Sequence, residues 1–288
     1  MRKRFLTLLV AAATVFFGCN DKNGTTPDII EPDLSGAPEL PADPQPANSS
    51  FNHRIMLLQH TGTGCSNCPR MMTSLKELSQ DKEYNSKYVH VAAHSYNPDD
   101  PCYSTAAKQI SDPFCTAWPE LSFNLSGEKT DGDSAIPTIK QFIDKLHKET
   151  ADVGIAAAAK IMNDGNLGII TEIKTAIEGN YRIAVWLLED GIESEQMGAT
   201  ADWQHIHNNA LRAMAGGTLN QRIYGEKVGI VLPGEKQSST FVIKTDKNWN
   251  MDNCKVIILA NVQQPDGRFD VANCIICPIG ESVTYDYK

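Results

Sequence analysis

The pattern of hydrophobic and polar positions divides the chain into two parts of different rhythm. In residues 51–150, short apolar runs at 54–60 and 87–93 predict buried strands, and apolar positions at three-to-four spacing over 69–79 predict a helix between them. Strands that alternate with helices are typical of a sheet covered by helices. The first part is therefore predicted to be an α/β domain.

Residues 151–288 instead carry short β-branched runs separated by turn signals. The runs lie at 168–174, 181–188, 239–243, 255–260 and 269–272. The alanine-rich stretch 153–161 favours a helix by propensity alone, but its neighbours favour counting it as a strand. Roughly seven short strands with turns between them predict an Ig-like β-sandwich. The expected fold class is thus α/β plus all-β, with the domain boundary near residue 150.

The first residues are predicted to be an export signal. Arg2, Lys3 and Arg4 precede an apolar run that is too short to span a bilayer, and the run closes at Gly18-Cys19. A small residue directly before a cysteine resembles a bacterial lipoprotein signal, in which residues 1–18 are removed and a lipid is attached to Cys19. The predicted location is an oxidising compartment, with the membrane as a partner through that lipid.

Residues 19–50 are predicted to be a tether, because they are rich in proline and poor in apolar residues. Removal of the signal peptide changes the formal net charge from −9 to about −12. Such an acidic chain is expected to be repelled by the negatively charged phosphate backbone of nucleic acid. Nucleic acid is therefore excluded as a partner.

The segment Gly64-Cys65-Ser66-Asn67-Cys68-Pro69 lies where the first strand gives way to the helix. A Cys-x-x-Cys at a helix N-terminus can be a redox pair, with Cys65 as the attacking thiolate and Cys68 as the resolving thiol. The same pair can equally be a structural disulfide, Cys65–Cys68, in an exported protein. A metal site would need further ligands, for which His94, His205 and His207 are candidates, but neither a metal nor a cofactor is expected.

Strand, Cys-x-x-Cys at the helix start, strand and then Ile136-Pro137-Thr138 together resemble the thioredoxin fold. The resemblance implies a cis bond at Pro137 and, if the pair is redox-active, a catalytic site of Cys65, Cys68 and Pro137. Cys68 and Pro137 are further apart than in thioredoxin, so residues of about 95–133 are expected to form an inserted lid or edge loop.

The remaining cysteines are assigned by position. Cys102 and Cys115 both lie in the expected insertion, which predicts a Cys102–Cys115 disulfide. Counting outward from the turn at 265–267 places Cys254 nearly opposite Cys277 on one strand face, which predicts Cys254–Cys277. The pair Cys254–Cys274 is the second choice, and one cysteine remains odd.

The lipoprotein signal, the tether, the Gly-x-x-Cys-x-x-Cys-Pro turn, His207-Asn208 and Leu211-Arg212 together resemble one family, named for a 28-kilodalton outer membrane protein of Gram-negative bacteria. The resemblance implies an outer-membrane lipoprotein that faces either the periplasm or the cell surface. Its function is expected to be binding or adhesion, with an exported protein, a peptide or a glycan as ligand. The alternative is a thiol–disulfide oxidoreductase that acts on exported proteins through Cys65 and Cys68.

Overall fold

The structure, a computed structural model, describes residues 36–288; the signal peptide, Cys19 and the first half of the expected tether lie outside them. Residues 36–50 do not form a free spacer as predicted. Asp43 and the carbonyl oxygen of Pro46 lie 3.3 and 2.7 Å from the Nζ atom of Lys174, whose side chain is buried. A buried ammonium needs such partners, and this end of the tether supplies them.

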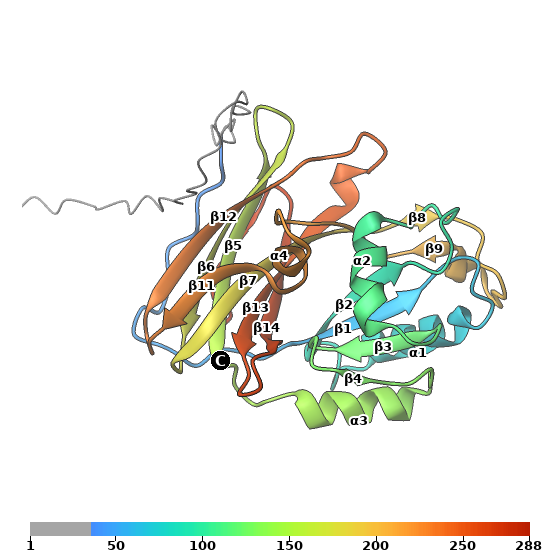
Figure 1. The fold of residues 1–288 in the computed structure, drawn as a ribbon, viewed down its shortest axis with the longest axis horizontal. Helices are drawn as coiled ribbons and strands as arrows, with labels where there is room; N and C mark the ends of the chain where they lie inside the picture. Colours follow the sequence, from blue (N-terminus) through green and yellow to red (C-terminus); the bar gives the residue numbers. More distant parts are fainter. Residues whose placement is uncertain (1–35) are drawn as a thin grey trace, which may run out of the picture. The chain divides into compact units, whose positions relative to one another are not determined.

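The first half has the helices and strands of a thioredoxin-like pattern (Figure 1). They are β1 (Ile55–Thr61), α1 (Cys68–Gln80), β2 (Tyr88–His94), α2 (Thr105–Phe114), β3 (Glu120–Phe123), β4 (Glu128–Lys129) and α3 (Ile136–Leu146). The strand order is β2-β1-β3-β4, with β1 parallel to β2 and antiparallel to β3. Ile55 and Leu57 of β1 pack against α1 and α3, whereas Met56 and Leu58 pack against α2. Alternate residues of β1 therefore bury both faces of the sheet.

Two predictions for this half are wrong. Pro137 has no cis bond but lies exposed in the first turn of α3, where a proline needs no N–H partner. The cis bond among the described residues joins Trp118 to Pro119, directly before β3, and the pairing of His60 with Glu120 places it beside the end of β1. Residues 95–133 accordingly hold α2, β3 and β4 of the pattern itself, and they are not an insertion.

The second half contributes three groups of antiparallel strands, of which the smallest pairs Ile192–Glu193 with Ile206–His207, and one short α-helix. They are β5 (Val153–Ile161), β6 (Leu167–Thr175), β7 (Gly179–Glu189), β8 (Ile192–Glu193), β9 (Ile206–His207), β10 (Ala210–Met214), α4 (Leu219–Tyr224), β11 (Glu226–Val231), β12 (Lys236–Ile243), β13 (Cys254–Gln263), β14 (Phe269–Pro278) and β15 (Ser282–Val283). A four-stranded sheet, β12-β6-β5-β15, packs on β7, β13 and β14 through a shared apolar core. The prediction that residues 153–161 form a strand is confirmed, and the second half is a pair of packed antiparallel sheets.

The structure does not divide at residue 150. β10 pairs with β7 on one edge and with β2 on the other, so that one sheet has the strand order β14-β13-β7-β10-β2-β1-β3-β4. Its ninth strand, β11, pairs with β7. The link to β2 consists of the pair Ala210–Ala92 and a 2.8 Å hydrogen bond from the Ala92 N–H to the Asn209 carbonyl oxygen. The described residues, 36–288, belong to one compact unit. The sheet crosses the expected boundary because β10, from the second half of the sequence, lies between β7 and β2.

The predicted disulfides Cys102–Cys115 and Cys254–Cys277 are not formed. In the hairpin of β13 and β14, Cys277 pairs with Val256, two residues from Cys254, because a bulge at Ala260 and Asn261 shifts the register. Cys254 and Cys277 share a face, as predicted, but only diagonally. Cys274 belongs to the core on the other face, which excludes the second choice. Within residues 36–288, no helix has the length and apolar character needed to cross a membrane.

Candidate functional site

The cysteine pair lies where the sequence places it, at the junction of β1 and α1. Cys65 and Cys68 form a disulfide, and Cys68 is the first residue of α1. Ser66 and Asn67 between them are exposed, but Cys65 is only 3 % exposed and Cys68 is fully buried. The sulfur atoms are therefore covered, although the turn itself reaches the surface.

Residues 194–204, which we call the covering segment, bind this turn, although they lie about 130 positions later in the sequence. The side-chain amide of Gln196 donates to the carbonyl oxygens of Thr63 and Cys65 at 3.2 and 3.0 Å. The Met197 N–H donates to the Thr63 carbonyl at 2.8 Å. Gln204 donates to the carbonyl of Pro69 at 2.9 Å. Both glutamine side chains are buried, so these bonds are shielded from water.

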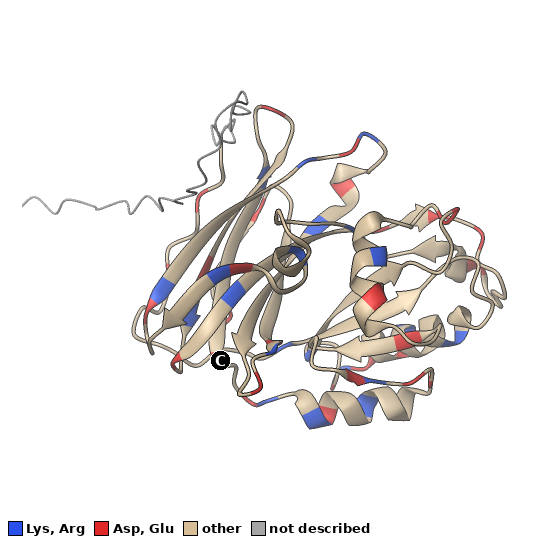
Figure 2. Ribbon diagram, viewed as in Figure 1, with Lys and Arg blue, Asp and Glu red and all other residues tan. Residues whose placement is uncertain are grey.

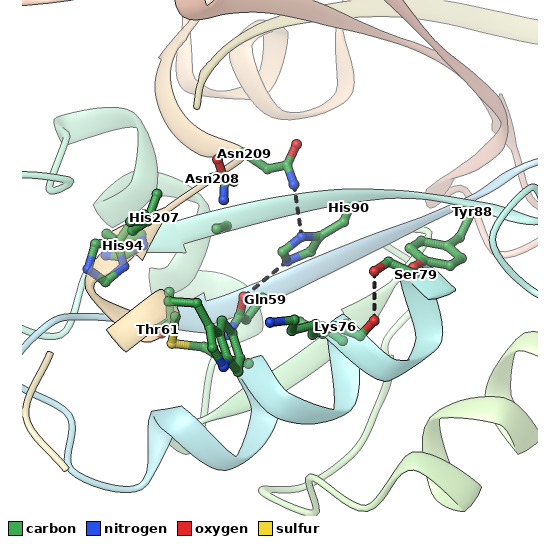
Figure 3. A pocket seen from close by; sticks show the side chains of 15 residues that line it. Gln59, Thr61, Lys76, Ser79, Tyr88, His90, His94, His207, Asn208 and Asn209 are labelled. Atoms are coloured by element: carbon green, nitrogen blue, oxygen red, sulfur yellow. Dashed lines mark hydrogen bonds between the residues drawn. The ribbon is translucent and has the colours of Figure 1, made fainter. Parts of the chain in front are cut away.

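A cavity of about 470 Å³ lies beside this turn, between α1 and residues 203–209 (Figure 3). Its floor is the face of β1 and β2 that carries Gln59, His90 and His94. Apolar side chains form most of the walls: Met72 and Leu75 of α1, with Trp203 and Ile206 opposite. The Lys76 Nζ atom lies 4.0 Å from the centre of the Trp203 ring, a cation–π contact between the walls.

A chain of hydrogen bonds crosses the floor of the cavity (Figure 3). The Asn209 side-chain amide donates to Nδ1 of His90 at 3.1 Å, and Nε2 of His90 donates to Oε1 of Gln59 at 3.0 Å. Burial lowers the pKa of His90 to about 4, so the ring is neutral and can accept and donate in this way. The Gln59 amide nitrogen is left without a partner. This nitrogen is itself buried beneath the floor, so the polar groups that face the open side of the cavity include those of Lys76 and Asn208.

Other candidate residues have structural surroundings. His60 is fully buried, with its ring nitrogens 3.0 and 2.9 Å from the hydroxyls of Ser111 and Ser122. His205 accepts from the Gln196 N–H, whereas His207 lines the cavity with His94. Lysines, arginines and acidic residues are interspersed over the described chain (Figure 2).

Sequence reasoning missed the covering segment and most of the cavity wall. Gln196 and Gln204 lie about 130 residues from the turn that they hold. Neither shows a spacing pattern with the cysteines, so no local signal connects them. The pairing of β10 with β2 brings this part of the chain close to α1, together with hydrogen bonds such as that from Arg212 to the Pro101 carbonyl oxygen.

The comparisons with known proteins agree with this architecture. The family model described as Omp28, outer membrane protein Omp28, matches residues 116–282, more than half of the chain, and the matched region begins after the cysteine pair. The structure of HBP35 of Porphyromonas gingivalis superposes with a TM-score of 0.66 over 82 % of this chain and 78 % of that chain, at 12 % identity. A domain of the outer membrane lipoprotein Omp28 from the same organism has a TM-score of 0.31 at 16 % identity, covering 45 % of this chain and 88 % of that chain. No curated protein matches the chain. The likeness to HBP35 supports the fold.

Proposed function

Because the chain belongs to the Omp28 family of outer membrane proteins, we propose that it is a lipid-anchored binding protein of the cell envelope. The lipid is attached to Cys19, and the ligand site is the cavity between α1 and residues 203–209. The Cys65–Cys68 disulfide stabilises the turn at the end of β1 and does not exchange with substrates.

The burial of the disulfide is the observation that carries this proposal. A catalytic pair needs an attacking sulfur that a substrate can reach, and Cys65 is only 3 % exposed beneath its own chain. The covering segment makes backbone-directed hydrogen bonds to Thr63, Cys65 and Pro69, so access requires several of them to break together. A cysteine pair held in this way is a structural disulfide.

The cavity has the size and lining of a ligand site. Its volume of about 470 Å³ falls within the range of ordinary small-molecule pockets, roughly 300–1,000 Å³. Trp203 and Ile206 offer apolar surface, and the exposed side chains of Lys76 and Asn208 offer hydrogen-bond donors. These groups suit a short peptide segment or a sugar unit with a hydrogen-bond acceptor.

Peptide and glycan arrays probed with the purified protein test the binding site. Ligands of the cavity should lose most of their signal with Trp203→Ala and Ile206→Ala, because both side chains line the cavity. Trp118→Ala is the matched control, because Trp118 is exposed and does not line the cavity. Array signals that survive both cavity variants, or that only Trp118→Ala removes, would place binding elsewhere.

A thiol–disulfide oxidoreductase is the second candidate. It is favoured by the position of the pair at the first turn of α1, on a thioredoxin-like arrangement of strands. Such an enzyme would have to displace the covering segment in every cycle. Cys68→Ser leaves Cys65 free to trap partners as mixed disulfides, and Cys274→Ser is the control. A clean non-reducing gel from cells supports the binding protein, whereas a set of trapped partners supports the enzyme.

A further inference from the structure

Three side chains of metal-ligand type meet next to the cavity, separate from the cysteine pair. His94 ends β2, His207 belongs to β9, and Cys102 lies between β2 and α2. One ligand atom of each lies within 4.8 Å of those of the other two, and all three residues are buried. The His94 and His207 rings meet edge to face with centres 5.1 Å apart, and both line the cavity (Figure 3).

The two histidines are oriented by groups behind them. Nδ1 of His94 lies 2.7 Å from Oδ2 of Asp100, and Nε2 of His207 lies 3.2 Å from the carbonyl oxygen of Ser194. Each acceptor holds the N–H of its ring, which leaves a lone pair on the second nitrogen. Histidines that bind metal ions almost always have this arrangement, in which a carboxylate or a carbonyl fixes the tautomer.

Asp100 is itself held in place by hydrogen bonds. Its carboxylate accepts from the N–H groups of Thr63 and Cys102 at 2.8 and 2.7 Å. The carboxylate is buried, so these bonds and its contact with His94 hold it in one position behind the cluster.

We propose that His94, Cys102 and His207 bind one zinc ion. Imidazole nitrogen and cysteine sulfur are the ligands that zinc prefers in tetrahedral sites. The double positive charge of the ion is balanced by the Cys102 thiolate and the Asp100 carboxylate, which suits a buried site. The Cys102 proton is released to solvent when the ion binds. Three protein ligands leave a fourth position for water or for a group from the adjoining cavity.

This site does not use the disulfide, although two of its ligands line the proposed ligand cavity. Both sulfurs of the cysteine pair are joined to each other, so neither is available as a zinc ligand. Of the five free cysteines among the described residues, only Cys102 is grouped with two histidines. The site is also built from both halves of the chain, so a bound ion would hold β9 against the end of β2.

Zinc binding is measured on the purified, chelator-treated protein by calorimetry, with cobalt as a spectroscopic probe. One ion per chain is expected, with a thiolate-to-cobalt charge-transfer band and an absorption edge that shows one sulfur and two nitrogen ligands. Cys102→Ser should remove the band, and His207→Gln should weaken zinc binding by roughly tenfold or more.

One histidine and one cysteine outside the cluster serve as controls. His205→Gln and Cys115→Ser should bind zinc like the unchanged protein, because neither residue belongs to the cluster. The X-ray absorption edge of the unchanged protein identifies the zinc ligands even if a cluster variant fails to fold. Absence of stoichiometric zinc, an edge without sulfur, or equal weakening by His205→Gln would overturn the proposal.

Discussion

Gln196 donates from its side-chain amide to the carbonyl oxygen of Cys65 at 3.0 Å, across 131 positions of the sequence. This bond joins the covering segment to the turn that contains the disulfide. Gln196 is 4 % exposed, and its nitrogen also reaches the carbonyl of Thr63. The relationship explains how a Cys-x-x-Cys at a helix start can be shielded from solvent.

Replacement of Gln196 by alanine should therefore loosen the cover. The change leaves the carbonyls of Thr63 and Cys65 without this donor, at an expected cost of about 1–3 kcal/mol in the free energy of unfolding. Dithiothreitol should reduce the Cys65–Cys68 disulfide faster in this variant, as followed by mass spectrometry of alkylated thiols. Gln237→Ala, at an exposed glutamine, should change neither quantity. Equal behaviour of the two variants would show that Gln196 does not hold the cover.

Gly198 of the covering segment packs closely against the turn. Its φ is +75°, and a Cβ atom there would lie 2.4 Å from the Ser66 carbonyl oxygen. Gly165 has a similar φ of +82° with nothing within 4 Å, so Gly165→Ala isolates the cost of the backbone conformation, about 1–2 kcal/mol. Gly198→Ala should destabilise the protein more than this control in urea unfolding, and it should also speed reduction of the disulfide. The same cost for both variants would contradict the close packing.

His60 should make the protein sensitive to acid. Burial lowers its pKa to about 3, with a smaller effect from Lys129, whereas the unfolded value is about 6.5. The unfolded chain thus binds a proton that the folded chain lacks, so stability is full above pH 6.5 and falls as the pH decreases toward 3. The slope from this residue is about 1.4 kcal/mol per pH unit.

His60→Gln should flatten the pH dependence of the urea-unfolding free energy by about that slope between roughly pH 6 and 4. His205→Gln is the control, because the His205 side chain is one-third exposed. An unchanged slope in His60→Gln would mean that the ring is protonated in the folded state.

Arg212 and Glu189 form a buried ion pair that joins β10 to β7, with Nε and Oε2 2.6 Å apart. Arg212→Met leaves the Glu189 carboxylate buried without its counter-charge and should cost about 3–5 kcal/mol in thermal or urea unfolding. Adding Glu189→Gln should recover part of this loss. Lys255→Met, at a partly exposed pair with Asp190, should cost about 1 kcal/mol or less. Similar losses for the two single variants would contradict the burial of the first pair.

The sequence predicts the local structure better than its assembly. Apolar runs locate β1, β2 and β7 within two residues, and even the alanine-rich β5 is correctly predicted from the rhythm of its neighbours. The pairing of β10 with β2 has no such signal, because a single backbone bridge joins segments more than a hundred residues apart. The prediction of two domains fails for that reason.

The candidate site shows the same division. Cys65 and Cys68 are found by spacing alone, but their burial depends on Gln196 and Gln204, which no motif connects to them. Resemblance to the thioredoxin fold predicts the cis bond at Pro137, whereas the structure has it before β3, at Pro119. Motifs identify chemical types, and the long-range topology decides which of them meet.

The most direct test of the central claim is the rate at which glutathione reduces the Cys65–Cys68 disulfide in the folded protein. Mixed disulfides and free thiols are trapped by alkylation and counted by mass spectrometry. A structural disulfide predicts that reduction is no faster than global unfolding and rises in step with denaturant. Rapid reduction of the native protein, at a rate independent of unfolding, would contradict the binding-protein assignment and support the oxidoreductase.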